Sequence, residues 1–279
     1  MIKAIFFDID GTLVTNTSKL QASTKRAIEM AQANGILCGI ATGRSPVRIH
    51  ELVEELSLDM YVVYNGQLVF TAEETIVDHP FQPEVLQEIV TFADEKHRQI
   101  MFGGRDRLDG SMTMKLSEAI WLKRIVNLLP KKFPVRLLRE TLQKFSPHRR
   151  KERYEGLEIL NEPIYQCILL SAVSEQEKLA KLFPNCTFQR SNPYSVDIIP
   201  KGGSKLHGIE AFLEAKGIKN YEVMAFGDNY NDIEMLSGVG IGIAMGNAQK
   251  ATKEAAVYVT DTNEKDGIYK ALQHYKIIE

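Results

Sequence analysis

Short apolar runs alternate with amphipathic stretches over the first part of the chain. KAIFFD at 3–8 predicts a buried strand, and TKRAIEMAQANG at 24–35 predicts an amphipathic helix. Gly35 suits the left-handed position just past the end of that helix. ILCGIAT at 36–42 and MYVVYN at 60–65 predict the next two strands. Strands that alternate with helices are typical of parallel βαβ units, so the pattern predicts an α/β fold.

The alternation of short apolar strands and helices changes after Pro80 and Pro83, and it resumes near Lys201. The middle section combines predicted helices (PEVLQEIVTFADEKH at 83–97, EAIWLKRIVNLLP at 118–130) with predicted strands (QIMFGG at 99–104, YQCILLSA at 165–172). The last section has short buried runs again: VMAFGD at 223–228, VGIGIAMG at 239–246 and AVYVT at 256–260. We therefore expect a doubly wound, Rossmann-like parallel core built from residues 1–81 and 201–279, with an α+β domain inserted at 82–200.

Composition narrows the function classes. The chain has 279 residues, of which 44% are hydrophobic and 25% charged, with a formal net charge of -2. A charge so close to zero, without a basic run interleaved with aromatics, argues against nucleic acid as the main ligand. We expect no membrane association, because no apolar stretch approaches eighteen residues. The absence of a leader pattern and the three widely spaced cysteines favour the cytoplasm.

The first strand leads into two carboxylates, Asp8 and Asp10. Side chains two residues apart share a face of a strand, and the carboxyl ends of parallel strands are where α/β proteins bind ligands. Two neighbouring carboxylates repel each other unless a cation or a shared proton compensates. A simple turn at Asp10-Gly11 is the alternative, and the motif alone leaves the two interpretations even.

Two further stretches could bind an anion. Thr42 and Gly43 follow the next strand and are expected to open a helix, where a hydroxyl and free backbone N–H groups suit a phosphate oxygen; helix capping is the simpler alternative. In PKGGSK, Ser204 resembles a helix cap and Lys205 lies in the first turn, where a lysine opposes the helix dipole unless an anion is near. Lys201 is an equally visible neighbour.

The stretch AFGDNYNDIEML again ends an apolar strand with glycine and carboxylates. Asp228 is expected at the strand tip, and Asn231 and Asp232 at the start of the next helix. Helix capping could explain Asp232 alone. It does not explain why two separate strands both end in acids.

Together, DIDGTL, TGR, GGSK and GDNYND resemble the four motifs of the haloacid dehalogenase (HAD) superfamily of aspartate-nucleophile phosphatases. The motif order, the insertion between the second and third motifs, and the tail IAMGNAQKATKEAAVYVT resemble the Cof-like subgroup, whose cap is of type IIB. Val257 departs from the acidic residue frequent in relatives, and lies outside the four motifs.

The resemblance implies a magnesium-dependent phosphatase of small phosphorylated metabolites. Asp8 would be the nucleophile that forms an aspartyl-phosphate, and Asp10 the general acid and base. Mg²⁺ would bind Asp8, the backbone carbonyl of Asp10, and Asp228. The remaining roles implied are phosphate binding by Thr42, Gly43, Lys205 and Asn231, and orientation of Lys205 and the metal waters by Asp232.

Two other functions remain open from the sequence: a phosphomutase or phosphotransferase of the same superfamily, and a signalling module that holds a phosphoryl group. The inserted domain is expected to close over the site and select the leaving group. The run HRRKERYE at 148–155, with Arg149 and Arg150, is interpreted as a solvated surface rather than a second anion site. Trp121 is interpreted as a core residue, with Ile120, Leu122 and Ile125 at helical spacing. The oligomeric state is not predicted.

Overall fold

The computed structural model describes residues 1–49, 55–111, 114 and 154–279. The chain divides into two compact units. The core unit comprises Met1–His79 and Gly202–Glu279, and the inserted unit comprises Pro80–Lys201. Each unit has its own sheet and its own hydrophobic core.

The core unit is built on an eight-stranded sheet in the order β13-β12-β11-β1-β2-β3-β4-β5. Its strands are β1 (Ala4–Phe7), β2 (Leu37–Ala41), β3 (Met60–Val63), β4 (Leu68–Phe70), β5 (Thr75–Asp78), β11 (Val223–Gly227), β12 (Ile241–Ala244) and β13 (Tyr258–Val259). The six strands from β13 to β3 run parallel, while β4 and β5 add an antiparallel hairpin at one edge. The fold class is therefore α/β with a mainly parallel core sheet, as predicted.

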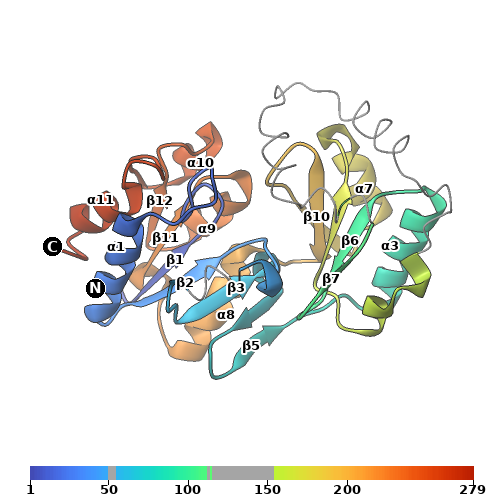
Figure 1. The fold of residues 1–279 in the computed structure, drawn as a ribbon, viewed down its shortest axis with the longest axis horizontal. Coiled ribbons are helices and arrows are strands. Elements are labelled where there is room, and N and C mark those ends of the chain that lie inside the picture. Colours follow the sequence, from blue (N-terminus) through green and yellow to red (C-terminus); the bar gives the residue numbers. More distant parts are fainter. Residues whose placement is uncertain (50–54, 112–113, 115–153) are drawn as a thin grey trace. The chain divides into compact units, whose positions relative to one another are not determined.

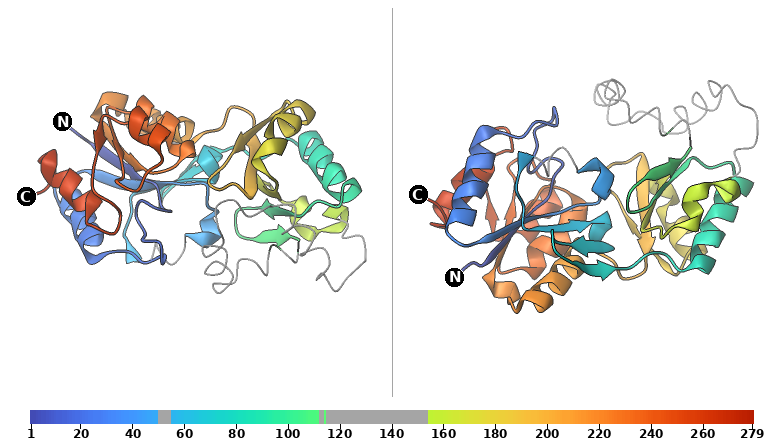
Figure 2. Two further views of the ribbon diagram at one scale, coloured as in Figure 1. Left: turned by 90° about the horizontal axis from the view of Figure 1, so that it is seen from above. Right: turned by 60° about the horizontal axis from the view of Figure 1, so that its bottom comes forward.

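Helices cover the two faces of this sheet (Figure 1). They are α1 (Ala22–Ala33), α8 (Lys205–Lys216), α9 (Ile233–Gly238), α10 (Lys250–Ala255) and α11 (Gly267–His274). Ala4 and Phe6 of β1 point to the face where α8 packs, and the ring of Phe6 meets that of Phe212 edge to face at 5.9 Å. The first and last helices, α1 and α11, lie side by side (Figures 1 and 2).

Two predicted helix ends are confirmed. Helix α1 ends just before Gly35, which has a φ of 76°, a left-handed value that glycine adopts without strain. Helix α8 begins directly after Ser204, whose hydroxyl accepts a hydrogen bond from the His207 backbone N–H over 3.2 Å. That bond satisfies one of the backbone N–H groups that lack a partner in the first turn, and it fixes Lys205 as the first residue of the helix.

The inserted unit is built on a five-stranded antiparallel sheet in the order β7-β6-β8-β10-β9. Its elements are α3 (Pro83–Glu95), β6 (Ile100–Gly103), β7 (Leu108–Gly110), β8 (Gln166–Leu170), α7 (Gln176–Leu182), β9 (Cys186–Gln189) and β10 (Ser195–Pro200). Helix α3 buries Ile89, Val90 and Ala93 in the core of this unit. The helix predicted at 118–130 lies outside the described residues.

Candidate active site

Asp8 follows β1 directly, at the centre of the core sheet. Its backbone N–H donates to the Phe226 carbonyl oxygen over 2.9 Å, which extends the ladder between β1 and β11 by one residue. The residue is 6% exposed. Because β1 lies between β11 and β2, the Asp8 carboxylate is held at the carboxyl edge of the parallel strands, where such sheets bind ligands.

Lys205 brings a buried positive charge to this carboxylate. Its Nζ donates to Asp8 Oδ1 over 2.5 Å and to Asp232 Oδ1 over 2.7 Å, and the side chain is 1% exposed. Burial lowers the pKa of Lys205, but the carboxylates of Asp232 and Asp8 outweigh it and hold the pKa above its ordinary value. The anions that offset the unfavourable dipole position of Lys205 are therefore these two side chains.

The loop after β11 supplies three more predicted site residues. Asp232 is fully buried, and its Oδ2 accepts backbone N–H groups of Asp228 and Asn229, both over 2.9 Å. Asp232 thus caps this turn while its other oxygen binds Lys205. Asn231 lies beside it on the short 3₁₀ helix η7 (Tyr230–Asp232) and is partly buried.

Asp8, Asp228 and Asp232 form an acidic cluster whose nearest oxygen atoms all lie within 4.8 Å of one another. Burial, and next the charge of Asp8, raises the pKa of Asp228 to about 8. Burial raises the pKa of Asp8 to about 7 against the opposing effect of Lys205, and Asp232 adds to the rise. One lysine does not neutralise three close carboxylates, so this donor set fits a hard divalent cation such as Mg²⁺.

Asp10 differs from Asp8 in its surroundings. Its side chain is 62% exposed and forms a two-pronged ion pair with Arg44, in which Nε donates to Oδ2 over 2.8 Å and Nη2 to Oδ1 over 2.5 Å. Strand β1 ends at Phe7, so the alternation that predicts a shared face for Asp8 and Asp10 does not extend through both residues. The Asp10 carboxylate is outside the acidic cluster of the described residues.

Thr42 and Gly43 follow β2, on the strand next to β1. The Thr42 hydroxyl oxygen accepts the Arg44 backbone N–H over 3.1 Å. The expectation that Thr42 opens a helix is wrong: the next helical turn is the 3₁₀ helix η1 (Pro46–Arg48), and Ser45 caps it. Pro46 explains the shift, because proline favours the first helical position and places the cap one residue before it. Thr42 is therefore buried beside the site without a capping role at η1.

The structure separates the two candidate lysines. Lys205 contacts Asp8, whereas Lys201 is exposed and donates to the Pro184 carbonyl oxygen over 2.8 Å within the inserted unit. Lys205 is therefore the lysine that reaches the nucleophile candidate.

Two residues of the site were not singled out from the sequence. Arg44, the third residue of the TGR motif, binds Asp10 as described above. Asn65 is 1% exposed, and its Oδ1 accepts a hydrogen bond from Asn231 Nδ2 over 3.3 Å. The signal available for Asn65 was the Asn-Gly pair directly after a buried strand, which is typical of a turn with positive φ.

Several predictions concern residues that the structure does not describe. Trp121 and its neighbours Ile120, Leu122 and Ile125 lie outside the described residues, as do Arg149, Arg150 and the rest of 148–153. At the end of the same charged run, Tyr154 is buried, and its hydroxyl donates to the Arg98 carbonyl oxygen over 2.9 Å.

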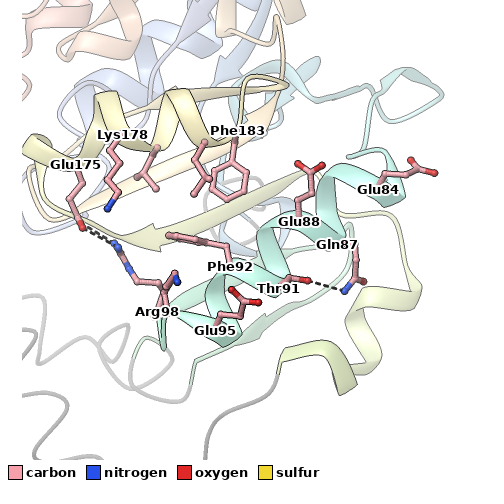
Figure 3. A pocket seen from close by; sticks show the side chains of 13 residues that line it. Glu84, Gln87, Glu88, Thr91, Phe92, Glu95, Arg98, Glu175, Lys178 and Phe183 are labelled. Atoms are coloured by element: carbon pink, nitrogen blue, oxygen red, sulfur yellow. Dashed lines mark hydrogen bonds and ion pairs between the residues drawn. The ribbon is translucent and has the colours of Figure 1, made fainter.

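The inserted unit has a groove between α3 and α7, with a volume of about 1080 Å³ (Figure 3). Phe92 and Phe183 line it, and an ion pair between Arg98 and Glu175 (3.0 Å) lies at one end. None of the sequence-predicted site residues that the structure describes lines this groove. It is thus separate from the acidic cluster of the core unit.

Comparison with known proteins gives one consistent result. The family of haloacid dehalogenase-like hydrolases matches residues 5–272. YkrA of Bacillus subtilis (strain 168), a candidate phosphatase, is 31% identical over 277 residues, which are 99% of each chain. The 5-amino-6-(5-phospho-D-ribitylamino)uracil phosphatase YcsE of the same organism is 28% identical over 98% of this chain and 96% of its own.

A solved structure agrees with these sequence matches. The HAD subclass IIB sugar phosphatase BT4131 superposes with a TM-score of 0.79 at 32% identity, over 99% of this chain and 100% of that one. Within the described part of the chain, no helix is both long and apolar enough to cross a membrane.

Proposed function

The chain belongs to the haloacid dehalogenase-like hydrolases and is a phosphatase of that family, and from this premise we propose that it hydrolyses small phosphorylated metabolites with Mg²⁺ through an aspartyl-phosphate. The observation that carries the proposal is the buried Asp8–Lys205–Asp232 arrangement beside Asp228. The names of YcsE and BT4131 support sugar phosphates and similar compounds as the substrate class.

The proposed first step is attack of an Asp8 carboxylate oxygen on the phosphorus of a monoester. Asp10 gives its proton to the leaving alcohol, and the P–O ester bond breaks as the aspartyl-phosphate forms. A water molecule then attacks the phosphorus, Asp10 takes its proton, and phosphate and the free Asp8 carboxylate result. Asp10 is exposed to solvent, through which it can exchange protons, and its ion pair with Arg44 favours the carboxylate form that takes the proton in the second step. The first step needs the protonated form of Asp10, in which this ion pair is open.

The remaining residues position and neutralise the phosphoryl group. Lys205 places its charge 2.5 Å from the Asp8 oxygen, and Thr42, Gly43 and Asn231 would donate hydrogen bonds to phosphoryl oxygens. Mg²⁺, bound by Asp8, the Asp10 backbone carbonyl and Asp228, would offset the repulsion between an anionic nucleophile and an anionic ester. Asp232 orients Lys205 by accepting a hydrogen bond from its Nζ.

We propose that the inserted unit is the cap that selects the leaving group. This role rests on its position in the chain between the second and third motifs and on the likeness to a subclass IIB sugar phosphatase.

The first experiment measures phosphate release from a panel of sugar phosphates, nucleotides, phosphorylated vitamins and an aryl phosphate, with Mg²⁺ or with chelator. Wild type should release phosphate only with the metal. Asp8→Asn should be folded and at least about 10³-fold slower, because it removes the nucleophile. Turnover near the wild-type rate in Asp8→Asn would contradict the mechanism, and no release by wild type from any compound would contradict the proposed function.

A further inference from the structure

The turn η2 (Tyr64–Gly66), between β3 and β4, has an unusual backbone. Tyr64 and Asn65 both have a φ of 52°, and Gly66 has a φ of 89°. Left-handed backbone costs a non-glycine residue roughly 1 kcal/mol, more for an aromatic than for asparagine. All three residues are nevertheless buried. Surrounding contacts must therefore hold this turn in place, as happens most often at functional sites.

The backbone of the turn holds the loop that carries Thr42. The Asn65 N–H donates to the Thr42 carbonyl oxygen over 2.9 Å, and the Tyr64 N–H donates to the Arg44 carbonyl oxygen over 3.1 Å. The turn thus fixes both ends of the Thr42-Gly43-Arg44 segment. Two site residues on that segment, the hydroxyl of Thr42 and the guanidinium that binds Asp10, depend on its position.

The turn also packs directly on the start of α8. A Cβ added to Gly66 would collide with the Ser204 carbonyl oxygen, and a Cβ added to Gly208 would lie 2.8 Å from the Gly66 Cα. Two glycines therefore allow the turn and the helix to touch backbone to backbone. This close approach sets the distance between the turn and Lys205, the first residue of α8.

The Asn65 side chain supplies the contact to the loop after β11. Its Oδ1 accepts the Asn231 carboxamide over 3.3 Å from 166 residues away in the sequence. A carboxamide nitrogen has two N–H donors, and Asn65 takes one of them. The other is thereby held in a fixed direction. Asn65 thus binds the TGR motif through its backbone N–H, at Thr42, and the GDNYND motif through its side chain, at Asn231.

We propose that Asn65 is a positioning residue for phosphoryl transfer, which acts by holding the Asn231 carboxamide in place for the phosphoryl group. The inference rests on the proposed function, because it assigns Asn231 to phosphate binding. Asparagine suits the position for two separate reasons: it tolerates left-handed backbone, and it provides the acceptor for Asn231. The two reasons can be separated by substitution.

Asn65→Gly is the informative variant, since glycine keeps the positive φ and removes the acceptor. We expect a folded protein whose kcat/KM falls about 10- to 100-fold and whose inhibition by inorganic phosphate weakens. Lys276→Gly is the matched control. Lys276 also has a positive φ (55°), but it is exposed and follows α11 near residue 279, more than 40 residues after Asp232 in the sequence. Kinetics and phosphate inhibition of this control should equal those of wild type.

A double-substitution cycle tests whether Asn65 acts through Asn231. Asn231→Ala should lower kcat/KM strongly in the wild-type background. In the Asn65→Gly background the same substitution should lower kcat/KM little further, because the contribution of the positioned carboxamide is already lost. Independent, multiplicative losses would overturn the proposal, as would wild-type kinetics in Asn65→Gly when wild type itself releases phosphate. An inactive wild type would instead count against the proposed function.

A second variant covers the case in which Asn65→Gly does not fold. Asn65→Asp keeps the acceptor and tolerates left-handed backbone. Asn231→Ala should then cost as much in the Asn65→Asp background as in wild type. If that cost disappears although the acceptor is retained, the proposal is wrong.

Discussion

At the scale of single residues, Lys205 places one buried positive charge between two buried carboxylates. It is 1% exposed and is shared between two carboxylates, Asp8 and Asp232, that are themselves buried. Removing one partner from a buried ionic group leaves the remaining charges without compensation, and that loss is larger than the net gain from forming the pair. Lys205 therefore supports stability and the proposed catalysis together.

Lys205→Met should lower the free energy of unfolding by about 3–5 kcal/mol and slow phosphate release by at least about 10²-fold. Lys201→Met is the matched control, since Lys201 is exposed and its ammonium group donates to a backbone carbonyl, that of Pro184, in the inserted unit. Urea denaturation and initial rates measure the two effects. Equal losses in both variants would contradict the assignment of Lys205.

Single residues of the site differ in how well the sequence predicts their contacts. Asp8, Lys205 and Asp232 were found because each stands at a predictable strand or helix end, and the structure brings them together. The ion pair between Asp10 and Arg44 was not predicted, because it depends on how two loops 34 residues apart approach each other. Periodicity describes a strand or a helix, but it carries no information about the direction of a side chain in a loop.

At the scale of elements, the contact between η2 and α8 leaves no space for a side chain at two positions. Gly66 and Gly208 let two backbones meet, so neither position has room for a methyl group. Gly217, which ends α8 with a φ of 65°, has nothing within 4 Å of its added Cβ. The two glycines Gly66 and Gly217 share a left-handed backbone and differ in packing.

Gly217→Ala should therefore cost only the backbone strain, about 1 kcal/mol. Gly66→Ala should cost about 2–4 kcal/mol, because overpacking adds to the same strain, and it should slow phosphate release by displacing the start of α8. Chemical denaturation of both variants measures the difference. Equal costs would mean that the turn yields to a methyl group and does not fix α8.

The elements themselves were predicted unevenly. The parallel strands and helices α1 and α3 follow apolar periods, the start of α8 follows from the cap residue Ser204, and the structure has all of them. The hairpin of β4 and β5 was missed, because strands of three and four residues beside an Asn-Gly turn resemble a loop. Strands β9 and β10 and helix α7 were also not predicted. Strand β9 and helix α7 have only four and seven residues, and in β10 the alternation of polar and apolar residues covers only Ser195–Ile198.

At the scale of the whole molecule, the acidic cluster makes stability depend on pH and on metal. The pKa values of Asp8 and Asp228 are raised to about 7 and about 8 in the folded protein, from an ordinary value of 3.8. The folded state thus favours their protonated forms. Their contribution to stability is fully present below about pH 4 and is lost as the pH rises through about 7 to 8.

Mg²⁺ should reverse this loss, because it binds the deprotonated carboxylates. We expect Mg²⁺ at about tenfold excess over its dissociation constant to raise the Tm by about 3 °C or more at about pH 8, and by less at about pH 5. Thermal denaturation with MgCl₂ or EDTA measures the shift. Asp228→Asn should abolish it, and a shift of equal size at both pH values would show that the cation binds elsewhere.

The core unit is assembled from two separate stretches of chain, and this has a consequence for how the protein is made. Ribosomes deliver the N-terminal stretch first, yet β1 pairs on one side with β11, which is encoded after the whole inserted unit. The contiguous inserted unit can complete its own sheet during translation. The strands β1 to β5 of the core unit meanwhile keep one edge of β1 unpaired until β11 has been synthesised. A nascent chain therefore contains Asp8 long before Lys205 emerges to neutralise it, and the active site can form only after the inserted unit and the loop with Asp228 and Asp232 have been synthesised.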